Sequence, residues 1–243
     1  MKVALLLSGQ PRFLRSASYQ SIKEKILDRY DCDVYCHFWW NPEGGEYITA
    51  PWSTLGNMKI PDRADADITE LYHPKKMRWD PPLSESDPLV SKKYARSNHP
   101  LSSYNLPSMY LSMKTSYLLM VEYLRGLDTD VHRQYDYVIR LRYDALLTNF
   151  PDLNELKRTA ETQTQLYAPD YSQFHNFIAN NGLIMTMGAA SMVMTIYDKI
   201  DELYEAGTKL NDEEMVTSLV KKYNIPAKIL PRETFYIDLV RCV

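Results

Sequence analysis

The feature that most constrains this chain is an uninterrupted apolar run at residues 3–7, which a Ser-Gly-Gln-Pro turn ends at once. A short run without polar alternation is typical of a central parallel strand covered on both faces. Residues with helical spacing follow, namely Ile22, Ile26 and Tyr30. We expect a capping box at Ser21 and Glu24, and a second strand at residues 33–39. Strand, helix and strand in this order predict a right-handed βαβ unit of an α/β fold.

Residues 41–108 differ in character, because they hold nine of the fourteen prolines. Proline interrupts long helices and central strands, so we expect an irregular insertion over the sheet edge. It would be either a lid on the acceptor side or a passive surface excursion. Beyond it, apolar periods predict helices at 108–126, 191–206 and 212–223, and strands at 137–141, 166–168, 183–187, 227–230 and 235–240. We expect all 243 residues to form a single domain.

Composition limits the class of protein. Lys and Arg number 28 against 31 Asp and Glu, and the net charge of −3 argues against a nucleic-acid-binding face. Three cysteines without a metal-ligand pattern are typical of reduced, structural thiols. The first apolar run is too short for a signal peptide, and no stretch approaches the ~20 apolar residues of a membrane span. We therefore expect a cytoplasmic protein without a membrane span.

The first candidate binding site is the turn after the first strand, which carries Ser8, Gly9, Gln10 and Arg12. Ligands of open α/β sheets bind outside the carboxyl ends of the strands. Gly9 lets the backbone approach a ligand closely, and Arg12 has the two-pronged geometry that grips a phosphate. The turn has neither a GxGxxG fingerprint nor a Walker loop. The alternative is a strand-ending turn with a surface arginine.

The second candidate site is Arg140, Arg142 and Asp144, at the end of the strand expected at 137–141. Alternation along an extended chain places these three side chains on one side. Buried charge is costly unless it is paired or binds a charged ligand. Asp144 is a hard oxygen ligand suited to Mg²⁺ or Mn²⁺ on a diphosphate, and the arginines would offset the phosphate charge. The alternative is an internal Arg–Asp ion pair that tethers the strand.

Two further side chains are candidates for contact with a nucleotide. Lys114 lies beside the apolar face of the helix expected at 108–126, so its amine must either reach water or meet an anion such as a diphosphate. His37 stands near the end of the second strand, where it would contact the base or the ribose. The other four histidines show no ligand spacing and are interpreted as structural.

Two carboxylates open a late helix. Asp212 and Glu213 follow Asn211, which is predicted to form a capping box with Glu214. The helix dipole favours acidic residues at this position, which explains them without a function. A sugar transfer with inversion needs a base near the acceptor hydroxyl, and either Asp212 or Glu213 would supply it.

Several segments together resemble a family. They are residues 4–12 (ALLLSGQPR), 33–39 (DVYCHFW, an Asp-x-x-x-His-x-Trp pattern), 137–144 (YVIRLRYD), 180–182 (NNG) and 212–214 (DEE). Their order and content resemble GT-A type glycosyltransferases of large algal viruses, phages and surface-polysaccharide clusters. The similarity spans most of the chain except residues 41–108. For a viral member, the cytoplasm would be that of the host.

The resemblance implies a Rossmann-type GT-A fold, in which an α/β half binds the nucleotide and a smaller half binds the acceptor. It also implies a UDP- or GDP-sugar donor, a glycan hydroxyl as acceptor, and Mn²⁺ or Mg²⁺. The family's Asp-x-Asp motif has two carboxylates, whereas Arg142 occupies the first position here. Arg142 could therefore neutralise the diphosphate in place of a metal.

Two other functions remain open from the sequence. One is sugar-phosphate nucleotidyl transfer, since related sheets serve both chemistries. The other is a non-catalytic module that binds a glycan or a nucleotide, for which an aromatic content of 12% would suit ring stacking.

Overall fold

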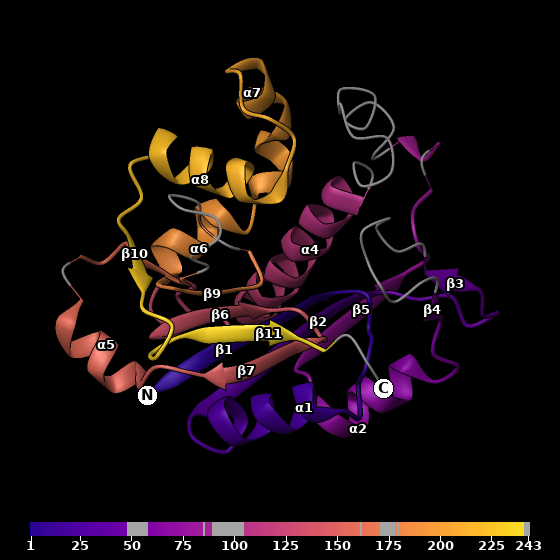
Figure 1. Ribbon diagram of the computed structural model, residues 1–243. Coiled ribbons are helices and arrows are strands. Elements are labelled where there is room, and N and C mark those ends of the chain that lie inside the picture. Colours follow the sequence, from indigo (N-terminus) through magenta and orange to yellow (C-terminus); the bar gives the residue numbers. More distant parts are fainter. Residues whose placement is uncertain are drawn as a thin grey trace.

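A seven-stranded sheet lies at the centre of the computed structural model, which describes residues 1–47, 58–84, 86–88, 105–160, 162–170, 178 and 180–240. Its strand order is β10-β8-β9-β6-β1-β2-β5. The sheet runs across the middle of Figure 1. The strands are β1 (Lys2–Gly9), β2 (Asp31–Trp39), β5 (Lys76–Asp80), β6 (Tyr137–Leu141), β8 (Leu166–Pro169), β9 (Gly182–Met185) and β10 (Ala227–Leu230). Only β9 runs antiparallel to its neighbours in this sheet. The predicted α/β class with an open, mostly parallel sheet is confirmed.

The first apolar run forms the middle of this sheet. β1 pairs in parallel with β2 on one side and with β6 on the other. Val3, Leu5 and Leu7 pack into the core on one face, while Ala4 and Leu6 pack into the core on the other. A strand buried on both faces needs apolar side chains at every position, which explains why this run does not alternate.

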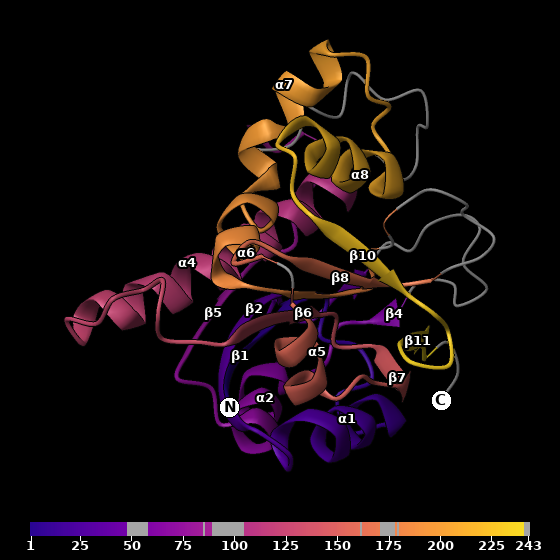
Figure 2. The same ribbon diagram turned by 90° about the vertical axis from the view of Figure 1, so that its left-hand side faces the viewer.

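Helices cover both faces of the sheet (Figure 1). One face carries α1 (Ala17–Ile22), the π-helical turn η1 (Lys23–Leu27), α2 (Ala64–Tyr72) and α5 (Leu153–Thr159). The other carries α4 (Asn105–Gly126), α6 (Met187–Val193), the 3₁₀ turn η3 (Ile196–Lys199), α7 (Ile200–Glu205) and α8 (Asp212–Lys222). The view in Figure 2 separates these two layers above and below the strands.

Two small antiparallel ribbons complete the described structure. β7 (Ala145–Asn149) pairs with β11 (Tyr236–Leu239), and β3 (Glu46–Tyr47) pairs with β4 (Met58–Lys59). The last strand expected from the sequence therefore exists, but it pairs outside the main sheet. Among the described residues, no helix combines the length and the apolar character needed to cross a bilayer.

The predicted capping box at Ser21 and Glu24 is wrong, because the helix begins earlier, at Ala17. Ser16 is its N-cap, and its hydroxyl oxygen accepts a hydrogen bond from the backbone N–H of Ser18. The Ser21 hydroxyl instead donates to the carbonyl of Ser18 and accepts from the backbone N–H of Leu147 in β7. A buried tertiary contact thus takes the hydroxyl that was expected to cap a helix.

The single helix expected at 191–206 is divided into α6, η3 and α7. The interruption falls at Thr195, whose hydroxyl donates to the carbonyls of Ser191 and Met192. Such bonds from a threonine to its own preceding turn compete with regular helix geometry and bend the chain.

The region 41–108 is more regular than expected where it is described. It contributes β3, β4, α2 and the edge strand β5 of the main sheet. The described prolines stand outside these elements, as Pro74 does just before β5 and Pro81 just after it. Pro107 lies in the first turn of α4, where a missing N–H costs little. In this region, prolines therefore lie at or near the ends of helices and strands, and their presence does not prevent regular structure between them.

Gly182 in β9 provides a test of this packing. A Cβ built there would lie only 2.8 Å from Cδ2 of Leu141 and would overlap Cδ1 of Ile237. Gly182→Ala should therefore lower the free energy of unfolding by about 1–3 kcal/mol through overpacking. Gly126→Ala is the control, because a Cβ there meets nothing within 4 Å. It should leave stability unchanged or raise it by up to about 1 kcal/mol. Urea denaturation measures both, and equal stability of the two variants would contradict this packing.

Candidate functional site

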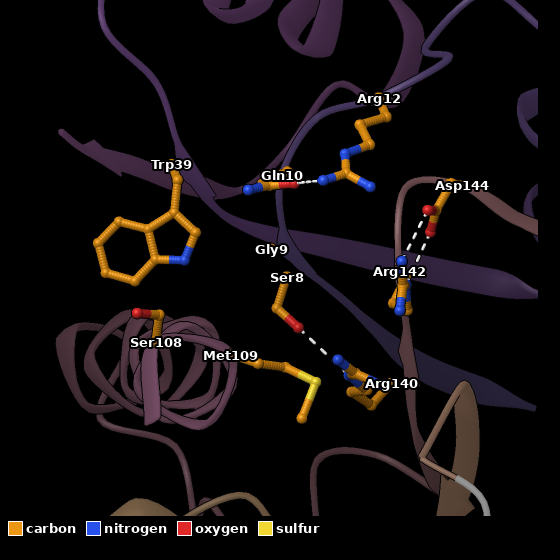
Figure 3. Close-up of a pocket in the computed structure, with 10 residues that line it drawn as sticks. All are labelled: Ser8, Gly9, Gln10, Arg12, Trp39, Ser108, Met109, Arg140, Arg142 and Asp144. Atoms are coloured by element: carbon orange, nitrogen blue, oxygen red, sulfur yellow. Dashed lines mark hydrogen bonds and ion pairs between the residues drawn. The ribbon is translucent and has the colours of Figure 1, made fainter. Parts of the chain in front are cut away.

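A pocket opens at the carboxyl ends of three neighbouring parallel strands, β1, β2 and β6 (Figure 3). Its volume is about 210 Å³. The residues that line it are Ser8, Gly9, Gln10, Arg12, Trp39, Ser108, Met109, Arg140, Arg142 and Asp144. The chain leaves β1 toward β2 on one side, whereas β6 lies on the other, so this is a topological switch point of the sheet. Open α/β sheets bind their ligands at such points.

Arg140 anchors the floor of this pocket. It is the largest side chain that the described residues bury completely. Its Nε donates to Oγ of Ser8 at 3.2 Å, and its Nη1 donates to the backbone carbonyl and to the side-chain Oδ1 of Asn180. A buried guanidinium is tolerated only when such acceptors replace water. Arg140 thus ties the ends of β1 and β6 to the segment before β9.

Arg142 and Asp144 form a two-pronged ion pair beside it. Nε and Nη2 of Arg142 donate to Oδ1 and Oδ2 of Asp144 at 2.8 and 2.7 Å. Burial raises the pKa of the Asp144 carboxyl, but the charge and hydrogen bonds of Arg142, with the charge of Arg12, bring it below its ordinary value. The Asp144 side chain is 5% exposed and that of Arg142 is 31% exposed. The guanidinium therefore reaches the open side of the pocket while its carboxylate partner stays inside.

Arg12 is the third guanidinium of the pocket. Its Nη2 donates to Oε1 of Gln10, and it lies 5.8 Å from the ring centroid of Tyr47. Its Nε is buried without a hydrogen-bond partner among the described residues. Burial lowers the pKa of Arg12, Asp144 opposes this shift, and Arg142 adds to it. An arginine stays charged under such a shift, so the site holds a partly desolvated cation with an unused donor.

The lining residues carry three positive charges and one negative charge, which leaves a net formal charge of +2. Confined positive charge of this kind attracts anions, and guanidinium groups match the geometry of phosphate. The volume is below the ~300–1,000 Å³ of a typical drug-sized ligand site. A ligand as large as a nucleotide-sugar would therefore extend past the described lining.

The lining does not fit a divalent cation. Among the lining residues that the structure describes, Asp144 is the only carboxylate, and both of its oxygens accept hydrogen bonds from Arg142. Across the part of the chain that the structure describes, no three His, Cys, Asp or Glu side chains are grouped to hold a metal ion. Mg²⁺ and Mn²⁺ require several free oxygen ligands, which this lining does not offer.

The structure brings seven of the expected site residues into this one pocket: Ser8, Gly9, Gln10, Arg12, Arg140, Arg142 and Asp144. The alternation that grouped the last three does not hold beyond Leu141, because β6 ends there and residues 143–144 form a turn. The Arg–Asp ion pair considered as an alternative is present. It coexists with the pocket, since both partners line it.

Lys114 and His37 are placed elsewhere. Nζ of Lys114 lies 2.6 Å from Oδ1 of Asp198, so this lysine links α4 to η3. His37 is fully buried, with Nδ1 2.7 Å from Oγ of Ser112 and Nε2 3.0 Å from Oδ2 of Asp80. Burial lowers the pKa of His37, and Asp80 opposes that shift. Neither residue lines the pocket.

Asp212 and Glu213 open α8 as expected, but their side chains lie outside the described part of the structure. Asn211 caps this helix, since its Oδ1 accepts the backbone N–H of Glu214 at 2.8 Å. The return bond of the predicted capping box differs, because Oε1 of Glu214 accepts from the side-chain amide of Asn211.

Sequence reasoning missed Trp39, Ser108 and Met109 as pocket residues. Trp39 could have been found, because it ends β2 and therefore lies at the same sheet edge as Gly9. Ser108 and Met109 belong to the first turns of α4. No local sequence signal shows which end of that helix meets the pocket.

Comparisons with known proteins leave the family open. No protein-family model and no curated protein sequence matches this chain. Solved structures with some similarity include the galactosyltransferase LgtC bound to donor and acceptor sugar analogues, at 13% identity and a TM-score of 0.46 over 93% of this chain and 73% of that one. Mouse xyloside xylosyltransferase 1 has 11% identity and a TM-score of 0.40 over 95% and 84%. The glycosyltransferase GlyE of Streptococcus pneumoniae TIGR4 has 12% and 0.41 over 93% and 44%. All three TM-scores are below 0.5, and all three sequence identities are below 25%.

The buried ion pair predicts a pH-dependent stability. Asp144→Asn should lower the free energy of unfolding at pH 7 by about 1–3 kcal/mol, because Arg142 loses a charged acceptor. The pKa of Asp144 is lower in the folded protein than in the unfolded chain, where it is about 3.9. The native protein should therefore have a higher free energy of unfolding than Asp144→Asn at pH values above 3.9. This difference should disappear as the pH falls through the folded pKa. Urea denaturation at several pH values measures this.

Asp198→Asn is the matched control for that experiment. Asp198 also forms an ion pair, with Lys114, but the Asp198 side chain is 46% exposed. Exposed pairs contribute little, so we expect a change of at most about 1 kcal/mol. Equal losses in the two variants, or a loss in Asp144→Asn that persists at acidic pH, would contradict the buried ion pair.

Proposed function

We propose that this protein is a glycosyltransferase that binds the diphosphate of a nucleotide-sugar in the pocket at the ends of β1, β2 and β6. The observation that carries the proposal is the grouping of Arg12, Arg140 and Arg142 with one carboxylate, at the switch point of a parallel sheet. A nucleotide-sugar diphosphate carries about two negative charges, which complements the net charge of this lining.

Each part of the lining has a role in this proposal. Arg12 and Arg142 contact the diphosphate, because both have guanidinium groups at the pocket wall (Figure 3). Arg140 holds the floor in place through Ser8. Trp39 offers an indole face for the base or the sugar ring, as aromatic side chains do in carbohydrate and nucleotide sites.

The chemistry that follows is sugar transfer to a glycan hydroxyl. The hydroxyl oxygen forms a bond to the anomeric carbon while the bond from that carbon to the diphosphate breaks. The arginines stabilise the negative charge that develops on the leaving diphosphate. If the configuration inverts, Asp212 or Glu213 takes the proton of the attacking hydroxyl. In a reaction with retention, an oxygen of the leaving diphosphate takes this proton, so that base is not needed.

We propose that the guanidinium of Arg142 takes over the charge neutralisation that a metal would otherwise provide. Asp144, bonded through both oxygens, orients this guanidinium and does not act as a metal ligand. The family resemblance points to Mn²⁺ or Mg²⁺, but the described lining supplies one carboxylate and no free ligand set. No step of the proposed reaction passes through a metal.

A thermal-shift panel tests the ligand class. UDP-, GDP-, CMP- and TDP-sugars are each added with Mn²⁺ and with a chelator. A ligand that binds the folded state raises the melting temperature by mass action. We expect a shift with one nucleotide family that survives chelation. A shift that requires Mn²⁺ would contradict the role of Arg142, and no shift with any nucleotide-sugar would favour a glycan-binding module.

Arg12→Gln tests the diphosphate contact. Loss of a charge-assisted hydrogen bond costs about 1.5–3 kcal/mol, so the nucleotide found in the panel should bind about 10- to 100-fold more weakly. Arg15→Gln is the matched control. Arg15 lies three positions further along the same loop, but it is exposed and paired with Asp67 and Glu70. Calorimetric titration measures both affinities. Equal affinity of Arg12→Gln and Arg15→Gln would remove Arg12 from the binding site.

A further inference from the structure

A chain of hydrogen bonds, one buried and two half-buried, runs from the edge strand β5 to the pocket wall. Oδ2 of Asp80 lies 3.0 Å from Nε2 of His37, and Nδ1 of His37 lies 2.7 Å from Oγ of Ser112. Oγ of Ser112 in turn accepts the backbone N–H of Gly9 at 2.8 Å. The chain connects β5, β2, α4 and β1, and it ends on a residue that lines the pocket.

The hydrogens along this chain can be assigned from its two ends. The Gly9 amide can only donate, so Oγ of Ser112 accepts there. The hydroxyl hydrogen of Ser112 has two acceptors in reach, Nδ1 of His37 at 2.7 Å and the backbone carbonyl of His37 at 3.4 Å, and the shorter contact is the stronger hydrogen bond. Nδ1 then accepts, which places the ring hydrogen on Nε2, facing the carboxylate of Asp80. The neutral tautomer of His37 therefore satisfies every polar atom of the chain.

Serine, histidine and aspartate also make up the catalytic array of serine hydrolases, but this arrangement cannot serve as one. Ser112 and His37 both have 0% exposure, so no substrate carbonyl can reach the serine oxygen. The serine is further engaged by the Gly9 amide. The chain ends on the backbone of the binding loop, which points to a positioning role.

The backbone of Gly9 is the part of the pocket wall that this hydrogen-bond chain holds in place. Its φ of +114° lies in a region that favours glycine, and a Cβ there would meet nothing within 4 Å. The positive φ, which would strain any residue with a Cβ, and not a lack of space, sets the requirement for glycine. Because this conformation is available to glycine among many others, the loop needs an external contact to hold it. The bond to Ser112 supplies that contact.

We propose that Ser112 and His37 are positioning residues for the ligand pocket, which fix the Gly9 backbone so that Ser8, Gln10 and Arg12 face the diphosphate. The identity of the ligand in this proposal rests on the proposed function. The hydrogen bond between the Gly9 amide and Ser112 does not depend on it. His37 thus contributes to nucleotide binding through Ser112 and Gly9, without touching the nucleotide.

Ser112→Ala tests the proposal in the full-length protein, with Ser116→Ala as its matched control. Both serines are fully buried on α4, one helical turn apart. The Ser116 hydroxyl bonds only within its own helix in the described structure, to the carbonyl of Met113. Two quantities are measured: the affinity for UDP and GDP by calorimetry, and the exchange rate of the Gly9 amide by NMR.

We expect Ser112→Ala to bind the nucleoside diphosphate about 5- to 20-fold more weakly and to exchange the Gly9 amide faster, while Ser116→Ala matches the native protein in both. Equal behaviour of the two variants would overturn the proposal, as would faster exchange without a loss of affinity. If the native protein binds neither UDP nor GDP, and the thermal-shift panel shows no response to a TDP-sugar, the proposed function fails. The exchange rate then decides alone whether Ser112 fixes the Gly9 backbone.

Discussion

The guanidinium of Arg140 has no access to water, and its hydrogen bonds hold together the segments around the pocket. A buried charge costs several kcal/mol unless the fold supplies hydrogen-bond acceptors. Here the acceptors are Ser8 at the end of β1 and Asn180 before β9. Holding this one side chain therefore brings the ends of separate strands to fixed positions around the pocket. Arg140 thereby places a fixed positive charge at the base of the pocket. The turn after β1 alone would not do so.

The pocket combines this floor with two cations that are less tightly held. Arg142 is oriented by Asp144 and is partly exposed, whereas Arg12 retains a buried donor without a partner among the described residues. Such an arrangement is suited to an anion with several oxygens, because each guanidinium can donate from a different direction. The helix α4 closes one wall and, through Ser112, holds the backbone of Gly9. Binding and scaffolding thus share the same elements.

Features fixed by short segments were predictable from the sequence, and features fixed by distant contacts were not. The apolar run of β1 and the charged residues at the end of β6 were sufficient to predict that Ser8, Arg12 and Arg140 meet in one pocket at the sheet edge. The alternation used for Arg142 and Asp144 was wrong, because a turn and not a strand brings them together. His37 illustrates the limit most clearly. Its place in β2 could be predicted, but its partner Ser112 lies 75 residues away on a helix whose crossing over the sheet no local pattern specifies.

In the proposed function, this pocket binds a diphosphate through arginine, without a metal between them. A crystal structure of the protein with UDP or GDP, grown in the presence of a chelator, would show this contact. We expect phosphate oxygens within hydrogen-bond distance of Arg12 and Arg142, with the ion pair between Arg142 and Asp144 retained. Phosphates bound at another surface, or a structure in which only an added metal ion joined to Asp144 holds them in this pocket, would contradict this proposal.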